Sequence, residues 1–383
     1  MEQAVGAVLT HGCMGPTAEE QFVERVRLRN LSHHIKALRE AGAAPVTVAT
    51  DADASLCKEL AHPPDQWITT PHTGFHFGET LKKVISSRSL QGCVYIGSGS
   101  GVLLRRADYE VLVTWARHPS ARMLVNNLYS TDFASFAQAQ TLLPLELPQI
   151  DNTLGVMLTD QGMPCRTLPR NLRTQYDIDT PTDVLLLKAT GRLIEEEPLP
   201  FEEQAVVSSA NAVMDTLTDR SGRLWIYGRV NPATWAWFQD RTACQTAGVI
   251  EGRGLRSYQG FASDAEIGRV CRSMFEQAGW DAFFTSLAKH ASAAILDTRP
   301  LLTTNSDMPS TADRFRSDLL RIARIENPTW KSFTQAAQRA SLPVLLGGHN
   351  LISGGLYAVG RSCWKRRNLE RRLCTKTTLE KKE

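Results

Sequence analysis

The sequence lacks the features that mark disulfide-rich, zinc-ribbon and membrane-spanning proteins. None of its eight cysteines forms a Cys-x-x-Cys pair, so we expect reduced, mostly buried thiols. The longest apolar runs, such as Val184–Leu187 and Val344–Leu346, are far shorter than the ~20 residues that cross a bilayer. The first residues carry no basic stretch followed by an apolar one, as a signal peptide would. We therefore expect a cytoplasmic protein with no membrane partner.

The sequence also has little net charge, and that charge is unevenly placed. The whole chain carries +3, but residues 361–383 contain nine Lys/Arg against three Glu, which leaves −3 on the remaining residues. A basic end of this kind can touch nucleic acid or an anionic surface. It can also be a solvated, flexible end, and we favour that interpretation. The mildly acidic body argues against a dedicated nucleic-acid binder.

What the sequence does contain is the pattern of two α/β domains. A chain of 383 residues is longer than a domain with a single hydrophobic core usually is. Hydrophobic residues make up 42% and charged residues 22%, which are proportions typical of a globular protein. In the first half, short apolar runs alternate with helical stretches, which predicts βαβ units and a largely parallel sheet. The expected strands are Val5–Leu9, Val46–Ala49, Cys93–Ile96, Met123–Val125 and Cys165–Leu168, and the expected helices are Ala18–Ala41, Thr153–Gln161 and Thr182–Ile194.

A charged, proline-punctuated segment follows at residues 195–200 and suits a linker. We place the domains at 1–197 and 198–360, with 361–383 as the basic tail. The second half alternates again, which predicts a second α/β domain. Its expected strands are Leu224–Tyr227, Gln245–Ile250, Ala293–Leu296 and Pro343–Leu346, and its expected helices are Pro232–Arg241, Asp264–Ala278, Trp280–His290, Ala312–Ile325 and Trp330–Ala340.

The sharpest motif of the first half is Tyr176–Asp183, YDIDTPTD. Pro181 suits the first turn of a helix, and Thr180 or Asp179 can cap it. On an extended segment, Asp177 and Asp179 can also lie on one face. Two carboxylates placed in this way could hold Mg²⁺, which takes oxygen ligands. The residues alone leave capping and metal binding both open.

The order Asp-Ile-Asp-Thr-Pro, followed by an acidic residue and an aliphatic helix, resembles the closing motif of the nucleotidyltransferase superfamily. That group has a nucleotide-diphosphate-sugar transferase-like fold and includes molybdenum-cofactor guanylyltransferases, 2-phospholactate guanylyltransferases and the cytidylyltransferases for acidic sugars. The resemblance covers about residues 4–195 and implies a Rossmann-like, GT-A-like first domain. In the sugar cytidylyltransferases an aspartate of this motif binds the catalytic metal. The resemblance therefore implies Mg²⁺ at Asp177 and Asp179.

Two loops depart from the family. Its first strand leads into a glycine-rich loop with a basic residue that cradles the triphosphate, whereas residues 10–16 here keep Gly12 and Gly15 but no nearby cation. Where the family places a metal-binding aspartate after a later strand, this chain has Ser98. The candidate nucleotide-binding residues are Gly12, Gly15, Gly97, Ser98, Gly99, Asn126 and Asn127. Residues 97–101 could be an anion-binding nest or a plain turn, and the two asparagines could bind a base or sugar or be turn residues.

In the second half, polar residues follow each expected strand. If the sheet is parallel, these strand ends share one edge, where ligands bind. Three arginines there would favour a phosphate or carboxylate. His349 could act as a general acid or base, oriented by Asp297 or Glu251; alternatively, the arginines pair with these two carboxylates structurally. The candidate ligand residues are Arg229, Asn231, Arg253, Asp297, Arg299 and His349.

Three functions remain open. The first is Mg²⁺-dependent transfer of a nucleotidyl group from an NTP to a phosphorylated or acidic small molecule. The second is a catalytically silent protein of the same fold that binds a nucleotide or sugar, which the altered loops favour. The third is an enzyme or sensor for a phosphorylated metabolite, with its site in the second domain. One fold hosts many functions, so the resemblance does not choose among them.

Overall fold

The computed structural model describes residues 4–53, 60–192, 198–252, 277–302 and 309–380. The chain forms two compact units. Among the described residues, the first unit comprises 4–16 and 23–178, and the second comprises 17–22, 179–252, 277–302 and 309–380. The units divide between Ile178 and Asp179, whereas the linker-like composition suggested a division near residue 198.

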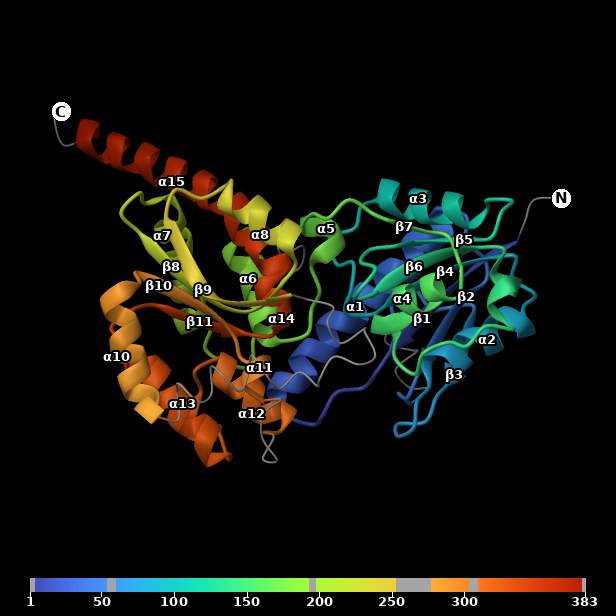
Figure 1. Cartoon of the computed structure of the whole chain (residues 1–383), viewed down its shortest axis with the longest axis horizontal. Helices are drawn as coiled ribbons and strands as arrows, with labels where there is room; N and C mark the ends of the chain where they lie inside the picture. Colours follow the sequence, from blue (N-terminus) through green and yellow to red (C-terminus); the bar gives the residue numbers. More distant parts are fainter. Residues whose placement is uncertain (1–3, 54–59, 193–197, 253–276, 303–308, 381–383) are drawn as a thin grey trace. The chain divides into compact units, whose positions relative to one another are not determined.

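The first unit is built on a seven-stranded sheet in the order β3-β2-β1-β4-β6-β5-β7 (Figure 1). Among these strands only β6 runs antiparallel to its neighbours. The elements are β1 (Val5–His11), α1 (Ala18–Glu40, whose first residues count with the second unit), β2 (Val46–Thr50), β3 (Gln66–Thr69), α2 (Phe77–Ser87), β4 (Gly92–Gly97), α3 (Arg106–Ala116), β5 (Arg122–Val125), β6 (Phe133–Ala137), α4 (Leu154–Asp160), β7 (Cys165–Thr167) and α5 (Leu172–Gln175).

Both faces of this sheet are buried, as the apolar strands require. Successive residues of β4 point to opposite faces. Val94 and Ile96 pack in the core formed with α1 and α3, whereas Cys93 and Tyr95 pack in the core formed with α2 and α4. Two helices thus cover each face of the sheet, and the predicted loops follow the carboxyl ends of its strands.

The second unit contains a four-stranded parallel sheet in the order β11-β10-β8-β9 (Figure 1). The aromatic side chains of α10 and α13 pack against β10 and β11. The elements are α6 (Pro181–Ala189), α7 (Gln204–Thr218), β8 (Arg223–Val230), α8 (Pro232–Gln239), β9 (Gln245–Gly252), α10 (Trp280–His290), β10 (Ala293–Asp297), α11 (Arg299–Leu302), α12 (Thr311–Asp318), α13 (Pro328–Arg339), β11 (Val344–Gly347), α14 (His349–Ile352) and α15 (Gly354–Glu380).

All nine predicted strands are present, and the predicted α/β class is confirmed for both units. The sequence prediction missed β3 and β6, which are short, and also α2, α3 and α7. The predicted helix 264–278 lies almost entirely outside the described residues.

Two predicted helices end early for local reasons. The helix that opens at Pro181 ends at Ala189, and Gly191 follows in the left-handed region with φ +64°. The helix predicted to run to Ile325 ends at Asp318, because Leu320 takes φ +57° and a 3₁₀ turn follows.

The basic end was predicted to be a flexible tail, and the structure describes it as helical up to Glu380. Figure 1 shows α15 as one continuous helix. Two of its basic residues make hydrogen bonds within the second unit: Arg366 Nε donates to Asp215 Oδ1 at 2.9 Å, and Arg367 donates to the carbonyl of Thr218. The composition gave the charge of this segment correctly but not its conformation.

Candidate functional site

In the first unit, the carboxyl ends of β1 and β4 lie side by side, since these strands are parallel neighbours. His11 closes β1, and its Nδ1 lies 3.0 Å from Ser98 Oγ, just after β4. Both side chains are buried. Ser98 stands where the resemblance would place a metal-binding carboxylate, and here it hydrogen-bonds to a histidine of the neighbouring strand.

The loop after β4 is held from α1. Asn30 Nδ2 donates to the carbonyls of Ser98 at 2.9 Å and Ser100 at 2.8 Å. His34 Nε2 lies 2.9 Å from the same Ser100 carbonyl, and its Nδ1 lies 2.7 Å from Tyr109 Oη. Burial lowers the pKa of His34 to about 3, so the imidazole is neutral. These contacts make the loop a fixed part of the core.

The same loop uses many of its backbone donors internally. The N–H groups of Gly97, Ser98 and Ser100 donate to other backbone carbonyls at 2.8–3.2 Å. A Cβ at Gly99 would lie 2.9 Å from the Ile178 carbonyl, so this position needs glycine for close packing. The geometry favours the plain-turn interpretation over the anion-binding nest.

Asn126 and Asn127, two further candidate nucleotide-binding residues, also use their side chains in internal hydrogen bonds. Asn126 Oδ1 accepts from the N–H of Asp132 at 3.0 Å, and its Nδ2 donates to Asp132 Oδ2 at 2.8 Å. Asn127 Oδ1 accepts from Tyr129 N–H at 3.2 Å, which is the Asx-turn pattern. Both asparagines are buried. Gly12 is exposed, with no atom within 4 Å of the position that a Cβ would take, and Gly15 is half-buried.

A buried tyrosine–carboxyl pair at this edge was not predicted. Tyr95 donates its hydroxyl to Asp151 Oδ2 at 2.5 Å. Burial raises the pKa of Asp151 to about 6, and the nearby charge of Asp132 adds to the effect, while the Tyr95 hydrogen bond opposes it. No sequence signal links these residues, because they are brought together only by the sheet.

The Asp-Ile-Asp-Thr-Pro motif spans the division between the units. Asp177 belongs to the first unit and is 5% exposed. Ile178 anchors the end of that unit, since its N–H donates to the Gly99 carbonyl at 2.7 Å and its own carbonyl accepts from Arg27 Nε at 2.7 Å. Asp179 opens the second unit.

The start of α6 follows the capping prediction. The Thr180 hydroxyl accepts from Asp183 N–H at 3.4 Å, and Asp183 Oδ2 accepts from Thr180 N–H at 2.7 Å, which is a capping box. Pro181 occupies the first turn. Thr180 is therefore the cap, and the Asp179 side chain is left for another role.

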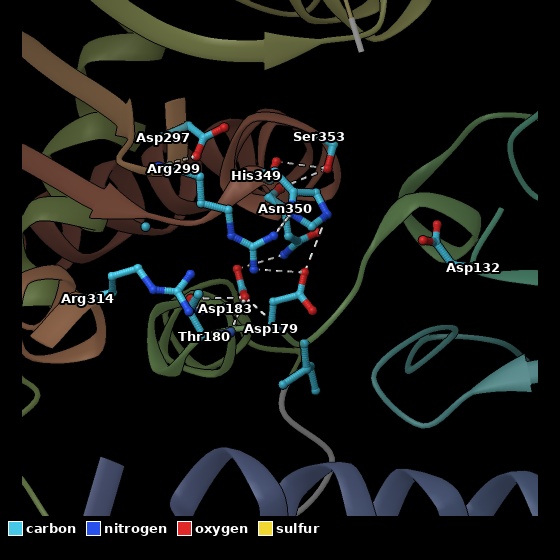
Figure 2. A network of polar contacts seen from close by, with 12 residues as sticks. Asp132, Asp179, Thr180, Asp183, Asp297, Arg299, Arg314, His349, Asn350 and Ser353 are labelled. Carbon is cyan, nitrogen blue, oxygen red and sulfur yellow. Dashed lines mark hydrogen bonds and ion pairs between the residues drawn. The ribbon is translucent and has the colours of Figure 1, made fainter. Parts of the chain in front are cut away.

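That role is in a polar cluster of the second unit (Figure 2). Asp179 Oδ2 lies 3.6 Å from Arg299 Nη2 and 3.4 Å from His349 Nε2. Arg299 Nη1 also hydrogen-bonds to His349 Nδ1. A guanidinium only donates, so Nδ1 accepts and the proton of the neutral ring lies on Nε2, toward Asp179. Arg299 and His349 follow β10 and β11, as predicted for a ligand edge of a parallel sheet.

Asp183 and Asn350 are the fully buried residues next to this cluster. Asn350 Nδ2 donates to Asp183 Oδ1 at 2.9 Å, and both side chains are fully buried. Burial raises the pKa of Asp183 to about 6, and the charge of Asp179 raises it further, while the hydrogen bond from Asn350 and the backbone N–H of Thr180 oppose the shift. Asn350 follows His349 directly, so this bond fixes the position of the histidine against α6.

Asp297, at the end of β10, is buried beside two arginines. Its Oδ1 accepts from the N–H of Arg299 at 3.0 Å. Burial raises the pKa of Asp297, and the charges of Arg229 and Arg299 oppose that rise. Gly228, with φ +144°, passes close by, and a Cβ there would lie 2.5 Å from the Asp297 Cβ. Both interpretations of the second half therefore hold in part: Arg299 has carboxylate partners, and it also lies at the ligand edge.

A second carboxyl–arginine group extends the cluster through α12. Asp318 is buried, and its Oδ1 lies 3.1 Å from Thr298 Oγ1. Burial raises the pKa of Asp318 to about 7, while the Thr298 hydrogen bond and the charge of Arg314 oppose the shift. Burial lowers the pKa of Arg314, and the positive charge of Arg299 lowers it further. These two arginines are thus near enough to repel each other.

Three other predicted residues are outside this cluster or outside the described part. Asn231 caps α8, with its Oδ1 accepting from Ala233 N–H at 2.9 Å. Arg253 lies outside the described residues, and so does the side chain of Glu251. Asp183, Asn350, Arg314 and Asp318 were not predicted as site residues. Asp183 lies in the predicted motif and Asn350 follows His349, but nothing in the local sequence separates Arg314 and Asp318 from ordinary helix residues.

Magnesium fits these residues poorly. Among the described residues, no group of three or more Asp, Glu, His or Cys side chains could hold a metal ion. Asp179 faces a guanidinium and an imidazole, and Ser98 replaces a carboxylate and bonds to His11. We therefore assign no catalytic step to a metal, and Mg²⁺ at Asp177 and Asp179 stays a prediction.

Several solved structures are similar to part of the chain. CMP:2-keto-3-deoxy-manno-octonic acid synthetase complexed with CTP is 15% identical and covers 43% of this chain and 89% of its own, with a TM-score of 0.33. A cytidylyltransferase from Leptospira borgpetersenii covers 51% and 89%, and a nucleotidyl transferase from Methanothermobacter thermautotroptrophicus covers 48% and 94%; each is 14% identical with a TM-score of 0.38. No family model and no curated protein matches the sequence.

Within the described part of the chain, no helix combines the length and the apolar character needed to cross a bilayer.

Proposed function

We propose that the second unit binds a small phosphorylated or acidic molecule at the cluster around Arg299. The observation that carries this proposal is the meeting of Arg299, His349 and Asp179 at the carboxyl ends of β10 and β11. Open parallel sheets bind ligands at this edge, and guanidinium groups bind phosphate and carboxylate through paired hydrogen bonds. This molecule is the acceptor in the nucleotidyl-transfer hypothesis and the substrate or effector in the second-domain hypothesis.

The two arginines give an electrostatic reason for an anion. Burial lowers the pKa of Arg314 and the charge of Arg299 lowers it further, so an anion near both arginines would be favoured, while the carboxylates around Arg299, Asp179 first among them, act against it. Burial also lowers the effective dielectric constant, which strengthens the attraction to a ligand charge. The Asp179 carboxylate pairs with the Arg299 guanidinium until such a ligand competes for it, while Asp297 accepts from the backbone N–H of Arg299.

His349 is the residue that could exchange a proton with the ligand. Arg299 donates to its Nδ1, so the ring presents Nε2–H toward Asp179. Nε2 already carries a proton, so the ring can take one up only at Nδ1, once a ligand draws Arg299 away from that atom; Asp179 beside Nε2–H would then stabilise the imidazolium form. The bond between Asn350 and Asp183 keeps the ring near this position.

Thermal shifts with inorganic phosphate and with citrate test the binding step. A ligand at ~100 times its dissociation constant stabilises by ~2.7 kcal/mol, which is readily measured. We expect the shift to be lost in Arg314→Gln and kept in Arg339→Gln, whose guanidinium forms an exposed ion pair with Asp281 in the same unit. Equal shifts in both variants, or none in the wild type with either anion, would contradict the proposal.

The second candidate is nucleotidyl transfer itself, with the NTP bound by the first unit and Mg²⁺ held by Asp177 and Asp179. The motif resemblance supports it, and Asp177 lies buried in the segment between α5 and α6. The silent alternative is supported by Ser98 and by the internal hydrogen bonds of Asn126 and Asn127. A cytoplasmic location, where NTPs are abundant, belongs to the same proposal.

Each of the four NTPs, with and without Mg²⁺, separates these cases. A base-specific, Mg²⁺-dependent shift that is lost in Asp177→Asn, together with release of pyrophosphate, would support transfer. A shift without turnover would support the silent alternative. Arg314→Gln should leave the nucleotide shift unchanged, because Arg314 belongs to the second unit. A failure of nucleotide binding would therefore leave the anion site standing.

A further inference from the structure

A compact group of indole rings and basic side chains lies on α8 and α15 of the second unit. We call it the indole–arginine face, and its members are Trp237, Arg241, Arg361, Trp364 and Lys365. Arg241 and Arg361 come from the end of α8 and from α15, yet both place their guanidinium groups over the ring of Trp237, at 5.7 and 5.9 Å from its centroid. Neither arginine has a role in the anion cluster described above.

Packing holds this face rigid. The Trp237 ring rests against Tyr357 with the centroids 4.5 Å apart. Trp364 Nε1 donates to the carbonyl of Arg241 at 2.7 Å, which joins α15 to the end of α8. The guanidinium of Arg367 lies 5.9 Å from the Trp364 ring centroid while it donates to the Thr218 carbonyl. The ring of Trp364 is therefore fixed in orientation.

Rigid as it is, the face is open to solvent. Trp364 is 42% exposed, one of three large hydrophobic residues with such exposure among the described residues. Arg241, Arg361 and Lys365 are also exposed. The neighbouring Arg366 is neutralised by Asp215, so the cations of the face are the three exposed ones. An exposed aromatic ring beside exposed cations suits a ligand that has both flat rings and regularly spaced negative charges.

We infer that the indole–arginine face binds single-stranded nucleic acid. A base would stack on the open part of Trp364, and the adjoining phosphates would contact Arg361, Lys365 and Arg241. The acidic average of the chain outside residues 361–383 does not oppose this, because α15 collects the positive charge in one place.

Fluorescence anisotropy with a labelled oligo(dT) and a labelled oligo(U), each about 12 nucleotides long, tests this directly. The full-length chain is used, and salt is varied from about 50 to 200 mM. The variants are Trp364→Ala, Trp364→Phe and Arg361→Gln/Lys365→Gln. The matched control is Arg220→Gln/Arg223→Gln, which removes two exposed cations from the same unit.

We expect Trp364→Ala to weaken binding roughly 5- to 100-fold, and Trp364→Phe, which keeps a stacking ring, to recover much of the loss. Arg361→Gln/Lys365→Gln should lower the slope of log affinity against log salt by about 1.4, the value for two phosphate contacts on a single strand. The control should bind like the wild type. Trp364→Phe loses the N–H bond and part of the ring but keeps an aromatic side chain, so it separates loss of stacking from loss of the contact with α8.

Three results would overturn the inference. One is the absence of any anisotropy change at the lowest salt. Another is wild-type affinity in both Trp364→Ala and the double variant. The third is Trp364-dependent binding to phosphatidylserine vesicles with no binding to either oligonucleotide, which would assign the face to a membrane surface instead.

Discussion

Asp318 makes the stability of the second unit depend on pH in a direction opposite to that of ordinary surface carboxylates. Burial raises its pKa from 3.8 to about 7 in the folded protein. Between these two values the folded chain holds a proton that the unfolded chain has released. Stability must therefore fall as the pH rises through this range. The hydrogen bonds agree with a protonated carboxyl, because Thr298 Oγ1 also lies 3.2 Å from the Gly347 carbonyl and can donate its one hydrogen there.

The size of the effect follows from the pKa difference. About three units at ~1.4 kcal/mol each amount to about 4 kcal/mol in all, and roughly 3 kcal/mol of this is lost between pH 5 and pH 8. Asn cannot ionise, and its amide can donate to Thr298 Oγ1. Asp318→Asn should therefore lose much less stability over the same range and should be more stable than the wild type at pH 8.

Urea unfolding at pH 5, 6.5 and 8, followed by tryptophan fluorescence, measures this. Asp183 also has a raised pKa, so the quantity of interest is the difference between the wild type and Asp318→Asn at each pH. The control is Asp281→Asn, which removes an exposed carboxylate of the same unit. It should keep the wild-type slope. Equal slopes for the wild type and Asp318→Asn would refute the assignment of the buried proton to Asp318.

Three further outcomes follow from the same structure. Gly228→Ala should cost on the order of 3 kcal/mol in thermal unfolding and weaken phosphate binding, because φ +144° and a Cβ 2.5 Å from that of Asp297 both oppose a side chain; a neutral variant would contradict this. Tyr95→Phe removes a hydrogen bond to the ionised form of Asp151, so it should destabilise the protein by about 1–3 kcal/mol and raise the pKa of Asp151 above 6. Carboxyl NMR titration measures that pKa, and an unchanged value would exclude the bond. Thr180→Ser should keep the stability of α6 while Thr180→Ala loses about 1 kcal/mol, and equal stability of the two would show that the cap is not used.

Much of the local structure could be predicted because its causes are local. Thr17 and Glu20 form a capping box, with Glu20 N–H donating to Thr17 Oγ1 at 3.4 Å and Thr17 N–H donating to Glu20 Oε2 at 3.2 Å, and Gly42 follows α1 with φ +89°. Asn231 caps α8 and Thr180 caps α6 in the same way. Each of these depends on residues within a few positions of one another, so the sequence shows them directly.

The contacts at the start of the basic end were not predicted, because composition does not give packing. Residues 361–383 have the charge of a solvated tail, but Ser362 and Cys363 are buried, and Trp364 bonds to the end of α8. A helix whose first turns are packed in a core can continue well beyond it. The burial of Ser362 and Cys363 is seen only in the structure.

The sequence by itself determined the α/β class, the strands and the helix caps, and it named Asp179, Asp297, Arg299 and His349 as site candidates. It could not show that Asp179 pairs with Arg299 and His349 rather than with Asp177, because that choice depends on which unit each residue joins. Nor could it separate the buried carboxyls of Asp183 and Asp318 from exposed ones. Only the tertiary structure decides how much water a carboxyl loses and which charges surround it, and these two quantities set its pKa and its role.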